Sequence, residues 1–133
     1  MKFSIIYEAQ MVDTSPASEQ RCFLECVEQS VYAEKMGFDT VWAVEHTALT
    51  YLSDEKITAG DEHTSNYSVA QDAYGNPDDC IRYCTRLQEA GADEILFMFQ
   101  MGGIPHEAIM ETIRNIGEKV IPYFRKQELR KSA

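Results

Sequence analysis

The chain has 133 residues, 44% of them hydrophobic, and its 12 Lys and Arg against 22 Asp and Glu give a net charge of −10. This length suits one domain with a core of its own, and the negative charge disfavours nucleic acid and acidic membrane surfaces as partners. No apolar run approaches the length of a membrane-spanning helix. The opening residues, MKFSIIYEAQ, are typical of a strand rather than a signal peptide. We therefore expect a cytoplasmic protein that binds neither nucleic acid nor membrane.

The first fifty residues predict a strand, a helix and a second strand. Residues 2–8, KFSIIYE, form a compact apolar run that is typical of a buried strand. Residues 18–36 follow a helical pattern and end at Gly37, a residue common just past helix ends. Residues 40–45, TVWAVE, begin with β-branched and aromatic side chains, which favour a strand.

The predicted first helix has its own start signal and its own apolar stripe. Ser18 is the expected N-cap residue. Leu24, Val27 and Val31 recur at intervals of three and four, so they share one face of a helix. We expect that face to pack into the core.

The middle of the chain loses this regularity. Residues 46–67 are rich in Ser, Thr, Asp, Glu and Gly and show little periodicity, which is unusual for so long a stretch inside a compact domain. Residues 68–74, SVAQDAY, predict a weak strand. His63 lies beside Asp61 and Glu62, but the spacing is not that of a metal site, and we expect none.

The last part of the chain predicts a helix, a strand and a final helix. Asn76 as N-cap, followed by Pro77 and two aspartates, is a strong helix start, and Gly91 closes that helix. Residues 94–100, EILFMFQ, are apolar almost throughout, as in a strand that is buried on both faces. The final helix spans 106 to about 126, and its expected core stripe consists of Ile109, Ile113, Ile116 and Val120. Pro122 is expected to bend or close it, and the charged tail, 127–133, is expected to fray.

Four cysteines form two C-x3-C pairs, Cys22 with Cys26 and Cys80 with Cys84, each within a predicted helix. This spacing puts both thiols of a pair on one helix face. Zinc binding or redox chemistry is conceivable, but structural zinc sites usually use tighter C-x2-C spacing in loops. We favour reduced cysteines that act as small apolar core residues.

Three segments of this sequence resemble one known family. FDTVWAVEHTAL (38–49) is similar to the second strand of bacterial luciferase-like flavin-dependent monooxygenases, which ends in Glu-His. The segment 75–125 resembles the end of the same family, with a Gly-x-Pro turn, a Gly-Ala-Asp joint before a strand, and a long last helix. MKFSIIYE fits its first strand. The resemblance covers about residues 1–50 and 67–126.

The family fold is a (β/α)8 barrel, which needs about 250 residues, so the resemblance implies that the central units are absent. We predict a single α/β domain that forms half of a TIM-type barrel, with four parallel strands in the spatial order 68–74, 94–100, 2–8 and 40–45 and three main helices. Its parts are a first βαβ part (1–50), an irregular join (51–66), a last βαβα part (67–126) and the tail. One sheet face would be bare, so we expect a homodimer, either closing one barrel or packing two sheets face to face.

The exits of parallel strands are where β/α proteins hold their ligands. The resemblance implies that His46 is the catalytic general base or acid, a task that suits a pKa near neutrality, with Glu45 orienting it or pairing elsewhere. On the residues alone, a His beside a Glu at a strand end also suits a solvated polar terminus. Thr47 departs from the family, which often has His there. The expected cofactor-binding residues are Glu8, Trp42, Gln100, Gly102 and Gly103, although Trp42 also suits the core and the glycine pair also suits a tight turn.

Two functions follow from this resemblance. In the first, a dimeric FMN-dependent monooxygenase oxidises a small organic substrate, supplied with reduced flavin by a reductase; a deazaflavin in place of FMN stays open. The single chain should bind FMN weakly or not at all, because the family's central phosphate-binding strands have no counterpart and no basic cluster replaces them. In the second, the chain is a non-catalytic remnant that serves as a small dimeric binding protein.

Overall fold

A computed structural model of the chain describes residues 1–9, 11, 13, 15–44, 75–100 and 103–131. In chain order, these residues form strand β1 (Lys2–Tyr7), helix α1 (Pro16–Lys35), strand β2 (Thr40–Ala43), helix α3 (Pro77–Glu89), strand β3 (Glu94–Phe97), helix α4 (His106–Asn115), the π-helical turn η3 (Ile116–Val120) and helix α5 (Ile121–Lys131). Within this part of the chain, no helix is both long and apolar enough to span a bilayer.

The three strands form a parallel sheet in the order β2-β1-β3. Ile5 of β1 is in register with Val41 on one side and Phe97 on the other. The fold is therefore α/β with a parallel sheet, and these three strands stand in the predicted order. The predicted fourth strand, 68–74, lies outside the described residues.

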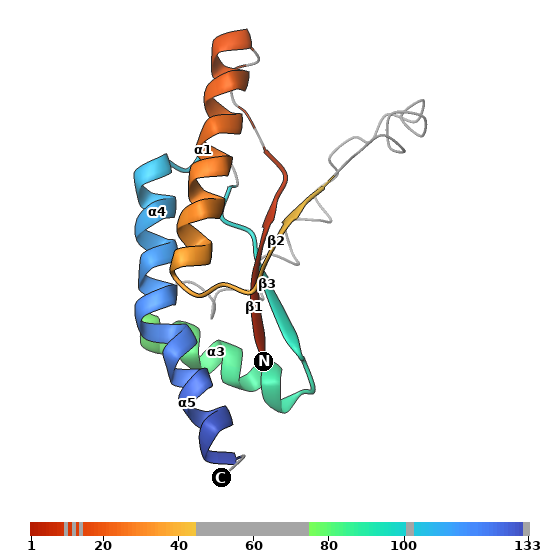
Figure 1. Ribbon diagram of the computed structural model, residues 1–133, viewed down its shortest axis with the longest axis vertical. Helices are drawn as coiled ribbons and strands as arrows, with labels where there is room; N and C mark the ends of the chain where they lie inside the picture. Colours follow the sequence, from red (N-terminus) through yellow and green to blue (C-terminus); the bar gives the residue numbers. More distant parts are fainter. Residues whose placement is uncertain (10, 12, 14, 45–74, 101–102, 132–133) are drawn as a thin grey trace.

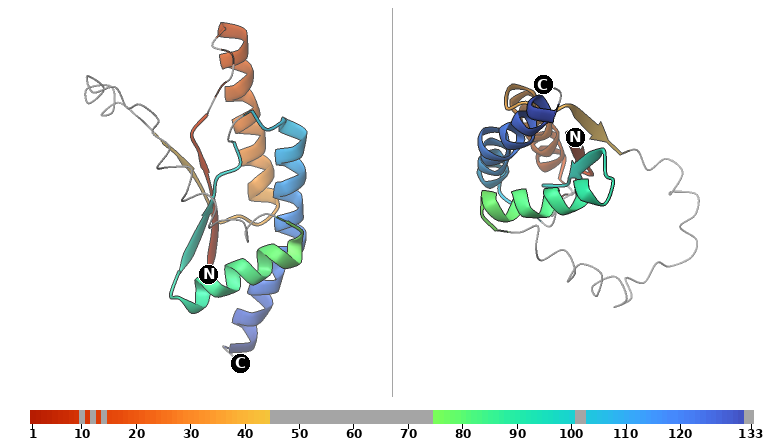
Figure 2. Two further views of the ribbon diagram at one scale, coloured as in Figure 1. Left: turned by 180° about the vertical axis from the view of Figure 1, so that it is seen from behind. Right: turned by 90° about the horizontal axis from the view of Figure 1, so that it is seen from below.

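One face of the sheet is covered by helices. Figures 1 and 2 show α1, α4 and α5 on the same side of the strands, with α3 packed near the amino ends of the strands. Phe3, Ile5 and Tyr7 alternate along β1 and are buried on this side. They pack against the predicted stripe of the last helix, which is buried as expected: Ile109, Ile113, Ile116 and Val120.

The other face carries apolar side chains that no described helix covers. Ile6 of β1 is in register with Trp42, and Ser4, two residues before it, is in register with Leu96. Side chains in register on parallel neighbours share a face. Trp42 is 48% exposed and Leu96 is 46% exposed. The bare face that the sequence predicts is thus present on the described strands.

Helix α1 departs from the sequence prediction in two ways. It begins three residues before the predicted cap: Ser15 is the N-cap and accepts a hydrogen bond from the Ser18 N–H (3.3 Å), while Pro16 occupies the first helical position. Moreover, Leu24, Val27 and Val31, the predicted core stripe, are exposed.

The buried face of α1 consists of small and polar residues instead, namely Ser18, Cys22, Gln29 and Ala33. These follow the same spacing of three and four, so periodicity alone identified two faces and could not choose between them. Helix α1 packs against α4, and small side chains allow two helices to approach closely.

Helix α3 begins as the sequence predicts. The Asn76 side chain accepts hydrogen bonds from the N–H groups of Asp78 (2.9 Å) and Asp79 (3.1 Å), and the Asp79 carboxylate accepts one from the Asn76 N–H (2.9 Å). This reciprocal capping box satisfies donors that a helix start otherwise leaves unpaired. Gly91 lies just beyond the helix end with φ +97°.

The last helix continues past Pro122 to Lys131, so the prediction of a fraying tail is wrong for residues 127–131. The π-helical turn η3 ends two residues before Pro122, which lacks an N–H and crowds the preceding turn. Long-range contacts then hold α5 in place. Arg125 donates to both carboxylate oxygens of Asp39 (2.6 and 2.7 Å) and Glu128 pairs with the amino terminus.

Gly117 in η3 marks the closest approach of two backbones. A Cβ atom there would lie 2.5 Å from the Cβ of Met36 and 2.6 Å from its carbonyl oxygen. We expect Gly117→Ala to destabilise the fold by about 1–3 kcal/mol in urea unfolding, because the clash outweighs the usual gain of alanine in a helix. Glu118→Ala, at an exposed position of the same turn, should change the free energy of unfolding by less than about 0.5 kcal/mol. Equal effects of the two variants would contradict the close approach.

Candidate functional site

The carboxyl ends of the three strands meet at one edge of the sheet. The Val44 N–H donates to the Tyr7 carbonyl (3.2 Å), which holds the exit of β2 against the exit of β1. Glu45 and His46, the predicted catalytic pair, follow Val44 directly in the sequence but lie outside the described residues, as does Gly102.

Gln100 lies beyond β3 and faces α1. Its Nε2 donates to Cys22 Sγ (3.1 Å), and Cys26 Sγ donates to its Oε1 (3.1 Å). Gln100 is buried, and one oxygen and one nitrogen of its amide are already bonded to thiols. The sequence predicted its place at the strand exit and a role in binding a cofactor; in the structure it fastens the chain after β3 to α1.

His106 joins the same region from the start of α4. Its Nδ1 lies 2.9 Å from Gln29 Nε2, and its Nε2 lies 3.5 Å from Glu28 Oε2. An amide nitrogen can only donate, so Nδ1 accepts and the proton resides on Nε2, toward Glu28. The His106 side chain is only 19% exposed, because it packs against α1.

We call these residues the strand-end cluster: Tyr7, Cys22, Cys26, Gln29, Gln100 and His106. Sequence reasoning missed that α1 contributes half of it. The signal was present, because positions 22, 26, 29 and 33 recur at intervals of four, three and four and thus define a helix face. Cys22 and Cys26 are predicted core thiols, yet Leu24, Val27 and Val31 are predicted as the buried stripe because those side chains are more strongly apolar.

Two buried atoms of the cluster, the Tyr7 hydroxyl and Gln29 Oε1, have no hydrogen-bond partner among the described residues. Burial raises the pKa of Tyr7 to about 12 and outweighs the opposing effect of Ser30, whose hydroxyl donates to the Cys26 carbonyl (2.7 Å). Burial, together with neighbouring Cys22, raises the pKa of Cys26 to about 11. Cys26 is therefore a protonated and unreactive thiol at neutral pH.

The other predicted cofactor-binding residues do not join this cluster. Glu8 is half-buried directly after β1, Trp42 stands on the uncovered sheet face, and Gly103 is exposed in the turn before α4 with φ +79°. Among the described residues, the predicted set is therefore divided between the strand exits and the open face.

All four cysteines are free, and Cys22 and Cys84 are fully packed, as expected of core thiols. On α3, Cys80 Sγ lies 3.9 Å from Cys84 Sγ, and the contact with Cys80 together with burial raises the pKa of Cys84. No group of three or more metal-ligating side chains occurs within the described ranges.

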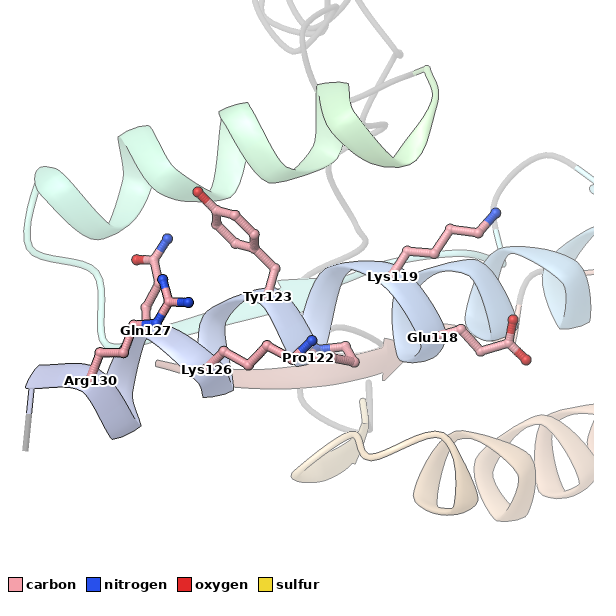
Figure 3. Close-up of a pocket in the computed structure, with 7 residues that line it drawn as sticks. All are labelled: Glu118, Lys119, Pro122, Tyr123, Lys126, Gln127 and Arg130. Carbon is pink, nitrogen blue, oxygen red and sulfur yellow. The ribbon is translucent and has the colours of Figure 1, made fainter. Parts of the chain in front are cut away.

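A shallow groove of about 420 Å³ runs along the last helix, far along the chain from the strand exits. Its lining comes entirely from η3 and α5: Glu118, Lys119, Pro122, Tyr123, Lys126, Gln127 and Arg130. Figure 3 shows the Tyr123 ring pointing toward α3, with the long charged side chains spread along the helix. The continuous helical segment formed by η3 and α5 supplies every lining residue, so this surface resembles a solvated helix face more than an enclosed site.

The chain matches no protein-family model, no curated protein and no solved structure. The resemblance to luciferase-like monooxygenases therefore stays a prediction, and function has to be inferred from the fold and from the strand ends.

The buried Tyr7 hydroxyl leads to a pH-dependent prediction. The pKa of Tyr7 is higher in the folded state (about 12) than its ordinary value of 10.0, so folding opposes ionisation, and stability falls as pH rises from 10 to 12. We expect Tyr7→Phe to reduce that loss by up to about 3 kcal/mol. Near neutral pH the variant should be neutral or about 1 kcal/mol more stable, because it removes an unpaired buried hydroxyl.

Urea unfolding at several pH values would measure this effect. Tyr123→Phe is the matched control, since that ring is exposed on α5, and it should keep the alkaline loss of the parent chain. A Tyr7→Phe variant that loses stability at neutral pH would show that the hydroxyl has a partner.

Proposed function

We propose that the chain is a truncated luciferase-like flavin-dependent oxidoreductase that works as a homodimer of half-barrels on a small organic substrate. The observation that carries this proposal is the arrangement of the sheet. Strand β1, first in the chain, lies between β2 and β3, as a closed ring of strands requires once its middle is removed.

The placement of the helices also supports a barrel origin. A doubly wound sheet can have the same strand order, but its helices cover both faces. Here the described helices that pack on the sheet lie on one side (Figure 2), as they do around a barrel, where the other side of the strands points inward.

The uncovered face supports a homodimer. Ile6, Trp42 and Leu96 would point toward the interior of a complete barrel, and each apolar Å² left in water costs about 25 cal/mol. The outer edges of β2 and β3 are also unpaired by any described strand. A second copy would cover the apolar face and pair at least one of these edges.

The described residues do not by themselves form a flavin phosphate site. Glu8 is acidic, Gln100 is bonded to two thiols, and the strand-end cluster holds no lysine or arginine. A single chain should therefore bind FMN weakly. The roles that we propose are limited to the chain's own residues: His46 transfers a proton at the exit of β2, and Glu45 orients its ring.

The same observation favours a second candidate, a non-catalytic dimeric binding protein. In that case, the strand-end cluster only holds α1 on the sheet, and the apolar face between two copies is the functional surface. Flavin binding separates the two candidates, because only the oxidoreductase needs it.

The first test is a titration of the purified protein with FMN, monitored by visible absorbance. A separate assay measures the oxidation of reduced flavin without added substrate. We expect binding to be detectable at dimer-forming concentrations, and we expect His46→Ala to reduce turnover by about 100-fold or more while binding persists. His63→Ala, at a histidine to which the resemblance assigns no role, is the matched control. If the chain does not bind FMN at any concentration tested, the oxidoreductase proposal is contradicted and the binding-protein proposal remains.

The second test concerns the dimer. Leu96→Ser on the open sheet face should raise the dimer dissociation constant by about tenfold or more, because it removes a central apolar contact. Leu129→Ser, at an exposed leucine of α5, should leave that constant unchanged. Sedimentation velocity over a concentration series measures both, and equal behaviour of the two variants would argue against closure through the sheet.

A further inference from the structure

The outer face of α1 is apolar, although it points away from the core. Phe23 is 67% exposed, Leu24 56%, Val27 46% and Val31 48%. Val27 and the buried Gln29 are two residues apart, so they lie on nearly opposite sides of the helix. We call these four residues the α1 stripe. The α1 stripe is separate from the uncovered sheet face, because α1 packs on the covered side of the strands (Figure 1).

The helix carries its larger apolar side chains in solvent and its small and polar ones inside. Exposed single apolar residues are common, but a contiguous apolar stripe along a helix usually marks an interaction surface. This arrangement, with apolar side chains outside and small or polar ones inside, is expected if the outer face of α1 binds another protein surface.

We propose that the α1 stripe binds the α1 stripe of a second copy of this chain, with the two helices antiparallel across a twofold axis. The argument for a second copy comes from the charges that border the stripe. Arg21 and Glu28 are seven residues apart, so they lie on the same flank, about 10 Å apart along the helix axis.

An antiparallel twofold places residues of the same flank opposite each other. With Leu24 packed against Val27 of the second copy, Arg21 of each chain comes within reach of Glu28 of the other, and the pair forms twice. Both side chains extend well into solvent, being 68% and 66% exposed. Within the chain, Arg21 donates to the Ser18 hydroxyl at 3.3 Å, but the ion pairs are long: Arg21 to Glu25 at 3.9 Å and Glu28 to His106 at 3.5 Å.

The antiparallel arrangement is also the one that uses both charges. In a parallel pair, the flank that carries Arg21 and Glu28 would face the opposite flank of the second helix. There Glu28 would meet Phe23 and Arg21 would meet Pro16. Complementary charges mainly set partner and orientation, while the four apolar side chains supply the attraction. Because the α1 stripe is short, the association belongs to the small and weak class of interfaces.

The test uses charge reversal, with Leu96→Ser as the background so that closure through the sheet does not contribute. Arg21→Glu or Glu28→Arg alone places like charges together, and each should raise the dissociation constant by about three- to tenfold. The double variant Arg21→Glu/Glu28→Arg restores opposite pairs and should return within about twofold of the background. Val27→Glu should raise the constant by about tenfold or more.

Controls separate this effect from net charge and from unfolding. Glu111→Arg on α4 changes the net charge by the same amount as Glu28→Arg, at a side chain that is 65% exposed and outside the α1 stripe, and should not weaken association. Far-ultraviolet circular dichroism should show every variant folded, since all substituted positions on α1 are exposed. The readout is sedimentation velocity over a concentration series.

The proposal is overturned if Val27→Glu leaves association unchanged, if the charge-reversed double variant fails to recover, or if the Leu96→Ser background is monomeric at every concentration. That last result would leave closure through the sheet intact. Conversely, association that responds to Val27→Glu and not to Leu96→Ser would support the α1 stripe and count against the dimer of half-barrels.

Discussion

One-sided burial of the three-stranded sheet is the constraint on which the rest of the molecule depends. Phe3 of the central strand stacks with Phe97 (ring centroids 6.4 Å apart) and packs against Phe124 of α5 (5.4 Å). The first strand, the third strand and the last helix thus meet in one aromatic contact. Because the helices converge on this face, the opposite face keeps its apolar side chains without a described cover.

The position of α1 links that core to the strand exits. Its buried face is small and polar and makes hydrogen bonds with Gln100 and His106, while Ala33, Tyr32 and Met36 pack on the apolar core. A buried polar cluster specifies one arrangement more strictly than apolar packing does, because each unpaired group is costly. The groups that fix α1 therefore lie at the carboxyl ends of the strands, where β/α proteins commonly hold their ligands.

The composition of the buried face of α1 also bears on the apolar residues at its outer face. The larger apolar residues of α1 have no room on a face that is occupied by thiols and amides, and they lie outside. The chain consequently presents two apolar surfaces on different sides, one on the sheet and one on α1. If both surfaces bind a second copy, as we propose, two twofold axes would allow a closed tetramer.

The sequence by itself determined the features that are set by local chemistry. The Asn76–Pro77 start of α3 depends on donors within one turn, the buried stripe through Ile113 and Val120 depends on spacing along one helix, and the parallel strands follow from alternating elements. It also placed Gln100 at a strand exit. Tertiary structure alone decided which face of α1 is buried, since both faces have helical periodicity and the choice depends on the space beside α4. It alone carried α5 beyond Pro122, because the ion pairs that hold that helix join it to residues far away in the sequence, Met1 and Asp39.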